Sequence, residues 1–381
     1  MGWVSAPSVD VLIPTYRRPS ALAVTLASLA GQDHPTFRVI VSDQSPVDEA
    51  VERVPEVMAT ARILDVGDHP ATFVRHVPRR GLAEHRQSLL DRASSPYVLF
   101  LDDDIYLEPT LIGRLVRAIR HAGCGFVGSA VVGLSFMGDD RPHERSVEFW
   151  DGPVLPEIVS PGSGAWVRHR LHNAANLHHL REDRPDAEER LYKVAWVGGC
   201  VLYDAAKLRA VGGFGFWRDL PEEHAGEDVV AQLRVMAQYG GAGLFPSGAY
   251  HLEVPTTVVD RTVDAPIALP SAFPAGLASE ELERGVDDRL GLDVADEGRV
   301  MLAAVRHRVL AAGGAGEPPR QEREVPGAKR ASRIHEIAAP EQTDDGRANG
   351  GGEMERPRIV ADDERRVGEQ TREFRERQPT R

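Results

Sequence analysis

Short apolar runs alternate with amphipathic stretches through the first part of the chain. The runs have the length and the branched or aromatic residues of buried strands, and the stretches between them repeat apolar residues at helical spacing. Strands separated by helices predict an α/β fold with a mostly parallel, Rossmann-like central sheet flanked by helices. The predicted strands are 9–14, 37–43, 71–76, 97–101 and 125–132, and the predicted helices are 21–30, 82–93 and one that starts at Pro109 after a cap at Glu108.

The pattern weakens from about Ser135 to Arg190, where Pro, Gly, His and charged residues dominate. A segment of this length without regular structure is typical of a binding loop or lid, so we expect it to select the acceptor of any reaction. Regular patterns then return. They predict a strand over 194–203, a helix over 204–211, a helix that starts near Glu227 and ends before Gly240, and a short strand at 243–246, after which the region closes with Ala249-Tyr250-His251.

The chain divides into a main domain and two accessory parts. The main domain is 1–265, with a first half at 1–133 and a second half at 134–265. A helical extension follows at 266–312, in which Val300–Leu310 is apolar enough to dock on the main domain or on a second subunit as a homodimer. Residues 313–381 are rich in Pro, Gly, Arg and Glu and predict a disordered tail.

Composition excludes several classes of protein. The 381 residues include 58 acidic and 45 basic side chains, a net charge of −13, which argues against a nucleic-acid binder. Cys124 and Cys200 are too few for a disulfide framework, and no secretory signal or apolar run of about 20 residues is visible. We therefore expect a cytoplasmic protein whose contact with the inner face of the membrane is at most peripheral.

The strongest chemical signal is the strand Tyr97–Leu101, which ends in Asp102, Asp103 and Asp104. Alternation along an extended chain would place Asp102 and Asp104 on one side and Asp103 on the other. Mg²⁺ or Mn²⁺ relieves the repulsion among such carboxylates and leaves positions free for phosphate oxygens. The alternative, that the aspartates cap the next helix, fits poorly because Pro109 places that cap at Glu108.

Other polar residues also follow predicted strands. Thr15 ends the first strand and Asp43 ends the second, so both would meet the three aspartates at the carboxyl edge of a parallel sheet. A carboxylate such as Asp43 can accept the imide N–H of uracil or thymine. The alternative for Asp43 is a turn residue, because Asp-Gln-Ser-Pro is a turn-prone sequence.

Several short motifs follow one another along the chain. They are Pro14-Thr15-Tyr16-Arg17-Arg18, Asp43, Arg80-Gly81 with Arg86, Asp102-Asp103-Asp104, Gly198-Gly199, Gly212-Gly213-Phe214 and Glu227-Asp228. In this order they resemble the family 2 glycosyltransferases with the GT-A fold, over about 9–255. The resemblance implies an inverting transfer of a sugar from a nucleoside diphosphate donor, with UDP or dTDP favoured, to a glycan, glycolipid or small-molecule acceptor. It implies Mn²⁺ or Mg²⁺ as cofactor and a place in polysaccharide or glycolipid biosynthesis.

The resemblance also implies roles for individual residues. Asp104 would bind the metal with Asp102, which also faces the ribose, and His251 is a further candidate ligand. The alternative is that His251 has a structural role, because a lone histidine is more often structural than a metal ligand. The residues that would bind the nucleotide sugar are Pro14, Thr15, Tyr16, Arg18, Asp43, Arg80, Gly81, Arg86, Asp102 and Asp103.

The acceptor side of the reaction needs a base. Glu227-Asp228 is similar to the acidic pair of the family, in which the aspartate deprotonates the acceptor hydroxyl. These acids also stand where a helix starts, and a capping role is compatible with catalysis. The acceptor wall would include Trp196, Gly198 and Gly199, although Trp196 equally suits the core. Trp217, Glu222 and His224 would form a mobile rim.

Three other functions share parts of this pattern. A sugar-phosphate nucleotidyltransferase should follow its first strand with a Gly-rich basic loop, where this chain has Pro14-Thr15-Tyr16. A phosphatase with an aspartate nucleophile should have a small residue where this chain has Ile105-Tyr106. A catalytically silent sugar-nucleotide or glycan binder would not need to retain both the aspartates and Glu227-Asp228.

Overall fold

A central sheet of eight strands organises the part of the chain that the structure, a computed structural model, describes: residues 6–172, 175–185, 188–258 and 260–269. The described residues all belong to one unit, Met1–Gly313. Because they end at residue 269, the predicted helix Val300–Leu310 and the predicted tail 313–381 lie outside them. The sheet order is β3-β2-β1-β4-β9-β6-β10-β8. The strands are β1 (Val9–Thr15), β2 (Phe37–Asp43), β3 (Ala71–Arg75), β4 (Tyr97–Leu101), β6 (Phe126–Gly128), β8 (Arg190–Tyr192), β9 (Cys200–Asp204) and β10 (Gly241–Phe245).

The sheet is mostly parallel. β1 pairs in parallel with both β2 and β4, β2 with β3, and β6 with β10. β9 runs antiparallel to both of its neighbours, β4 and β6, and β8 runs antiparallel to β10. The predicted α/β fold with a mostly parallel central sheet is therefore confirmed.

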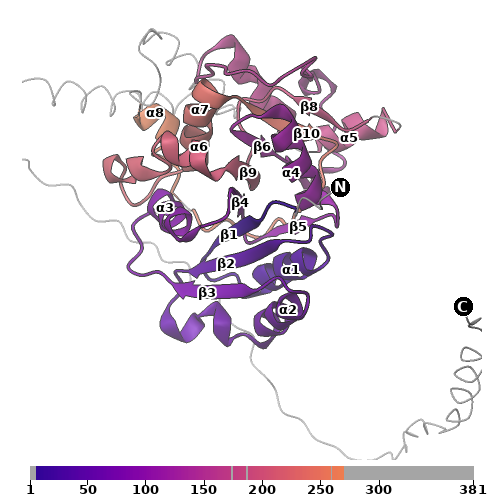
Figure 1. Ribbon diagram of the computed structural model, residues 1–381. Helices are drawn as coiled ribbons and strands as arrows, with labels where there is room; N and C mark the ends of the chain where they lie inside the picture. Colours follow the sequence, from indigo (N-terminus) through magenta and orange to yellow (C-terminus); the bar gives the residue numbers. More distant parts are fainter. Residues whose placement is uncertain (1–5, 173–174, 186–187, 259, 270–381) are drawn as a thin grey trace, which may run out of the picture. The chain divides into compact units, whose positions relative to one another are not determined.

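Helices cover both faces of the sheet (Figure 1). Side chains alternate along β1, so that Val9, Val11 and Ile13 pack with α1, α2 and α4, whereas Leu12 packs on the opposite face with α3, α6 and α7. Within the described residues, no helix has the length and apolar character needed to cross a bilayer. The helices are α1 (Pro19–Ala30), α2 (Pro55–Val66), α3 (Leu82–Arg92), α4 (Leu111–Ala122), α5 (Asn176–Glu182), α6 (Ala205–Ala210), α7 (Glu227–Tyr239) and α8 (Ala265–Ala268).

A second, three-stranded sheet has the order β5-β11-β7, with β5 at Ile105–Leu107, β7 at Val131–Gly133 and β11 at Ala249–His251. It shows that the single strand predicted over 125–132 is wrong. That stretch forms β6 and β7, which belong to different sheets, because the chain leaves the central sheet after Gly128 and β7 pairs with β11 instead.

The strand predicted over 194–203 is also wrong in its first half. Only Cys200–Asp204 forms a strand, because Gly199 has a φ of +72° and interrupts the extended chain. Before it, the backbone N–H and carbonyl of Val197 bond to the side chain of Gln232 instead of a neighbouring strand. This turn brings Gly199 beside Asp102, whose backbone N–H donates to the Gly199 carbonyl at 2.9 Å.

The helix after β5 begins later than predicted. α4 starts at Leu111 with Thr110 as its N-cap residue, so the cap is not Glu108. The carboxylate of Glu108 instead accepts a hydrogen bond from the Tyr250 hydroxyl at 2.7 Å. The sequence prediction did not include α2, nor α5 within the long segment 135–190, nor the short α8.

Candidate active site

Three carboxylates emerge from the end of β4, as predicted, but they point differently. The chain turns immediately after Leu101, so Asp103 and Asp104 converge on one nitrogen: Arg18 Nη1 donates to Asp104 Oδ2 at 2.8 Å and to Asp103 Oδ1 at 3.2 Å. The expectation that Asp103 faces away from Asp104 is therefore wrong. The Thr15 hydroxyl at the end of β1 also donates to Asp103, at 2.6 Å.

Burial makes this cluster prone to protonation. It raises the pKa of Asp103 to about 6, against the opposing effect of Thr15 and Arg18. Burial also raises the pKa of Asp104, against the opposing effect of His251. The cluster would therefore release protons when a cation binds among its carboxylates.

A buried arginine links Asp102 to α7. Arg86 on α3 is only 5% exposed. Its Nη2 donates to Asp102 Oδ1 and its Nε to Glu227 Oε1, each at 2.9 Å. Although burial opposes the charge, the two carboxylates raise the pKa of Arg86, which therefore stays cationic. The structure thus gives Arg86 a bridging role, and the predicted contact with a diphosphate stays a prediction.

Asp228 is the more available member of the acidic pair. Glu227 is buried and paired with Arg86, whereas Asp228 is half-buried at the start of α7. Burial and the neighbouring charge of Glu227 raise the pKa of Asp228 to about 7. A carboxylate with this pKa can take up a proton near neutral pH, which suits a general base. Its Oδ1 also accepts from the backbone N–H of Val229, so the capping and catalytic interpretations are compatible.

The residues that could hold a divalent cation are only partly assembled. His251 Nε2 lies 3.6 Å from Asp104 Oδ2, but among the described residues no three His, Cys, Asp or Glu side chains converge as a metal site. The chemistry of the carboxylates fits Mg²⁺ or Mn²⁺. His251 Nδ1 accepts from the Glu253 backbone N–H at 2.8 Å, so a neutral ring carries its proton on Nε2, and ligation through Nε2 would need the other tautomer.

The predicted base-binding residues lie at the ends of β1 and β2. The Arg79 guanidinium stacks 3.9 Å from the ring centroid of Tyr16, which is half-buried. The Asp43 carboxylate accepts from the backbone N–H groups of Ser45 and Val51 and from Arg75 Nη1. Asp43 therefore closes a turn, the alternative that the sequence left open, and its contact with a base stays a prediction.

The remaining predicted residues fall into two groups. Pro14 is buried near the end of β1, whereas Arg80 is exposed. Gly81 occupies the N-cap position of α3 and has a φ of +92°. On the acceptor side, Trp196 is half-buried, and its indole N–H has no hydrogen-bond partner among the described residues. The ring packs partly against the core, and Gly198 and Gly199 follow it toward Asp102.

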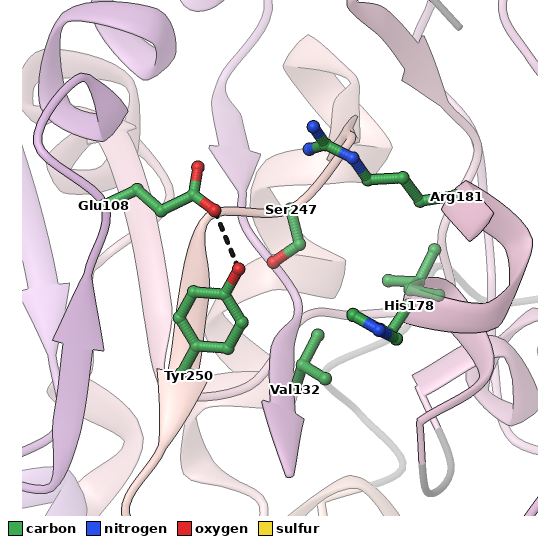
Figure 2. A pocket seen from close by; sticks show the side chains of 7 residues that line it. Glu108, Val132, His178, Arg181, Ser247 and Tyr250 are labelled. Carbon is green, nitrogen blue, oxygen red and sulfur yellow. Dashed lines mark hydrogen bonds between the residues drawn. The ribbon is translucent and has the colours of Figure 1, made fainter. Parts of the chain in front are cut away.

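A pocket lies near this region on the other face of the small sheet (Figure 2). Successive side chains of a strand alternate, so Tyr250 faces the pocket whereas His251 faces Asp104. The pocket is therefore separate from the acidic cluster. Its lining residues are Glu108, Val132, Leu177, His178, Arg181, Ser247 and Tyr250.

Sequence reasoning missed two parts of the site. Arg79 was not among the predicted site residues, and its stack on Tyr16 depends on the fold of the loop before α3. His224 was placed on a mobile rim, but it is 2% exposed and bonds to Ala83 in α3. Because 141 residues separate His224 from Ala83, no local pattern in the sequence could indicate this contact.

Comparison with known proteins finds similarity to glycosyltransferases. The sequence model of glycosyl transferase family 2 matches residues 10–173. The chain is 28% identical over 120 residues to a GalNAc(5)-diNAcBac-PP-undecaprenol beta-1,3-glucosyltransferase of Campylobacter jejuni, covering 32% of this chain and 36% of that protein. It is 30% identical over 161 residues to the succinoglycan biosynthesis protein ExoM of Rhizobium meliloti, covering 40% of this chain and 43% of ExoM. The chain thus spans less than half the length of these two relatives.

Among solved structures, the mannosyltransferase PcManGT from Pyrobaculum calidifontis, in complex with GDP-Man and Mn²⁺, is similar at a TM-score of 0.44 with 17% identity, covering 83% of this chain and 80% of that one. The structure of S. aureus TarS 1-349 in complex with UDP is similar at a TM-score of 0.43 with 15% identity. That similarity covers 76% of this chain and 73% of the TarS chain. The assignment rests on the sequence matches rather than on these structural similarities. Residues 10–173 of this chain thus match the sequence model of glycosyl transferase family 2, and the relatives that resemble the chain include a named glucosyltransferase.

Proposed function

We propose that this protein is an inverting, divalent-metal-dependent glycosyltransferase that moves a sugar from a nucleoside diphosphate to an acceptor hydroxyl. One observation carries the proposal: Arg86 bridges Asp102, at the end of β4, and Glu227, whose neighbour Asp228 has a pKa raised to about 7. A donor-binding edge and a general base are thereby held together. The match of residues 10–173 to the sequence model of glycosyl transferase family 2 supports this interpretation.

On the donor side, the stack of Tyr16 and Arg79 offers a flat surface beside which a nucleotide base can bind. Asp104, together with Asp102, would hold the cation. When bound, Mg²⁺ or Mn²⁺ would neutralise negative charge on the departing diphosphate. UDP-sugars and dTDP-sugars are the donors we favour, because their bases present an imide N–H to a carboxylate such as Asp43.

On the acceptor side, Asp228 would take the proton of the acceptor hydroxyl as that oxygen attacks the anomeric carbon. A single displacement of this kind inverts the configuration at that carbon. The half-buried Trp196 provides an apolar face for a sugar ring near Gly199 and Asp102. Relatives named for an undecaprenol-linked glycan and for succinoglycan biosynthesis support a glycan or glycolipid acceptor.

A donor panel tests the proposal. Release of nucleoside diphosphate is measured with Mn²⁺, Mg²⁺ or chelator for the wild type, Asp104→Ala and Asp228→Asn. We expect chelator and Asp104→Ala to weaken donor binding, because both remove the cation's contact with the protein. Asp228→Asn should retain donor binding and lose at least about 100-fold in transfer, because an amide cannot accept the proton.

The control for these variants is Asp151→Asn, which removes a carboxylate whose side chain is 90% exposed and paired with Arg190. It should leave turnover unchanged. Full activity in chelator together with full activity of both site variants would contradict the proposal. Release of pyrophosphate would indicate a nucleotidyltransferase, and donor binding without turnover of any acceptor class would indicate a silent binder.

A further inference from the structure

His224 occupies an unusual position for a residue of a surface loop. It lies three residues before Glu227, yet its side chain is only 2% exposed and enters the first turn of α3. There, Nε2 accepts a hydrogen bond from the backbone N–H of Ala83 at 3.1 Å. α3 begins after Gly81, which has no side chain to cap the helix, so His224 satisfies one of the free N–H groups at this end.

Both ring nitrogens of His224 are committed by partners of fixed type. The carbonyl oxygen of Pro221 lies 2.7 Å from Nδ1 and can only accept, so Nδ1 carries the proton. The backbone N–H of Ala83 can only donate, so Nε2 offers a lone pair. The two bonds coexist only in the neutral ring with Nδ1–H, which fixes the orientation of the imidazole.

The approach of the two segments is close. Gly81 has a φ of +92°, and a Cβ at this residue would lie 2.5 Å from His224 Cε1 and 2.7 Å from the Glu222 carbonyl oxygen. Only glycine allows the loop before α7 to lie this near α3. Five residues further along α3, Arg86 bonds to Glu227. α3 and the chain that leads into Asp228 are therefore joined at two points, His224 and Glu227.

We infer that His224 is a positioning residue for Asp228: by binding the first turn of α3, it fixes the carboxylate of Asp228 relative to Asp102. This inference rests on the proposed function of Asp228 as the base. Loss of the His224 contact would leave the Arg86 link to hold the α7 N-terminus against α3. The base would then be misplaced relative to the acceptor, whereas donor-binding residues on β1, β2 and β4 would not move.

The structure indicates that variants of His224 still fold. Ala225 is held from the opposite side, because its N–H donates to the Val263 carbonyl and its carbonyl accepts from Ala265, at 2.9 and 2.8 Å. The segment therefore stays attached when the imidazole is changed, and the displacement is local.

The test compares two amides. In His224→Gln, the side-chain oxygen can reach the position of Nε2 and accept from Ala83. In His224→Asn, the shorter side chain cannot. We expect kcat of His224→Asn to fall at least about tenfold with an unchanged donor KM, and His224→Gln to recover most of the loss, because misplacement of a catalytic group slows the chemical step.

A matched control separates positioning from helix capping in general. Asp204 caps α6 by accepting from the N–H groups of Ala206 and Lys207, each at 3.1 Å, and Asp204→Ala removes that cap. It should lower the unfolding temperature without lowering kcat. The inference is overturned if Asp204→Ala lowers kcat as His224→Asn does, or if His224→Gln is no better than His224→Asn.

The contact also has a readout that does not need turnover. Amide hydrogen exchange at Ala83 should accelerate in His224→Asn and stay slow in His224→Gln. If the wild type turns over no donor, the proposed function fails, and this exchange experiment still decides whether His224 holds the two segments together. Equal exchange in all three proteins overturns the inference.

Discussion

At the scale of single residues, environment gives chemically identical carboxylates different tasks. Asp103 and Asp228 are both driven toward the protonated form by burial, with pKa values of about 6 and about 7. Hydrogen bonds to Asp103 from Thr15 and Arg18 leave it little freedom to accept a substrate proton. Among the residues that the structure describes, Asp228 accepts only the Val229 N–H, on one oxygen, so it is the carboxylate suited to act as a base.

The charge of Glu227 should set the pH dependence of the reaction. Only the carboxylate form of Asp228 can act as a base, so kcat should rise with pH through about 7. Glu227→Gln removes a neighbouring negative charge while Arg86 remains. The pKa of Asp228 should then fall, and the rising limb of kcat should move to lower pH by about one unit.

The measurement is a kcat–pH profile between pH 5 and 9, taken at saturating donor and acceptor. Glu189→Gln is the matched control, because it removes a glutamate that pairs with another arginine, Arg114, at 2.6 Å. Its limb should coincide with that of the wild type. If kcat of Glu227→Gln rises over the same pH range as kcat of the wild type, Asp228 is not the group that titrates.

At the scale of elements, the sequence was most informative where an apolar run ends in a polar residue. β2 and β4 have the bounds that were predicted, because the runs at Phe37–Asp43 and Tyr97–Leu101 stop at carboxylates. β6, β7 and β9 were mispredicted, because their partners lie far along the chain and pairing decides where each strand ends. The contacts of Arg86 and His224 with residues 141 positions away leave no local pattern either.

The start of β1 should be sensitive to acid. Asp10 is fully buried and accepts from Arg38 on β2 and from Ser94 and Ser95 before β4, thereby joining three elements. Although burial opposes it, these hydrogen bonds lower the pKa of Asp10 from 3.8 to about 2. The stabilisation, about 2 kcal/mol, is present above pH 4 and is lost as the pH falls through 4 toward 2.

Asp10→Asn should therefore lower the free energy of unfolding by about 2 kcal/mol or more at pH 7, and the difference from wild type should shrink below pH 4. Urea unfolding at a series of pH values measures this difference. Asp91→Asn, which changes an exposed carboxylate bonded to Gln87, is the control and should differ little from wild type at any pH. A constant deficit for Asp10→Asn would contradict the account.

At the scale of the described molecule, the two predicted halves of the main domain share one sheet. β9 from the second half lies between β4 and β6 of the first, and β6 lies between β9 and β10. Arginines of the first half also bond across to the second: Arg18 to the Pro255 carbonyl, Arg86 to Glu227 and Arg114 to Glu189. The candidate site therefore lies where strands and charges of both halves meet, and neither half contains it alone.

Arg86 should couple the stability of this assembly to its chemistry. Arg86→Met keeps the apolar stem but leaves Glu227 buried without its cation, so the free energy of unfolding should fall by about 3 kcal/mol. Arg86 also lowers the pKa of Asp228. Its loss should move the rising limb of kcat to higher pH by about one unit, opposite to the shift expected for Glu227→Gln.

Adding Glu227→Gln to Arg86→Met removes the buried, unpaired charge of Glu227 and should restore part of the free energy of unfolding. It should also return the rise of kcat with pH toward its wild-type range. Denaturant unfolding and a kcat–pH profile on the two single variants and the double variant form a complete cycle. Strictly additive effects would show that Arg86 and Glu227 act independently. Coupling in both measurements would mean that one buried ion pair joins the halves of the domain and tunes the base.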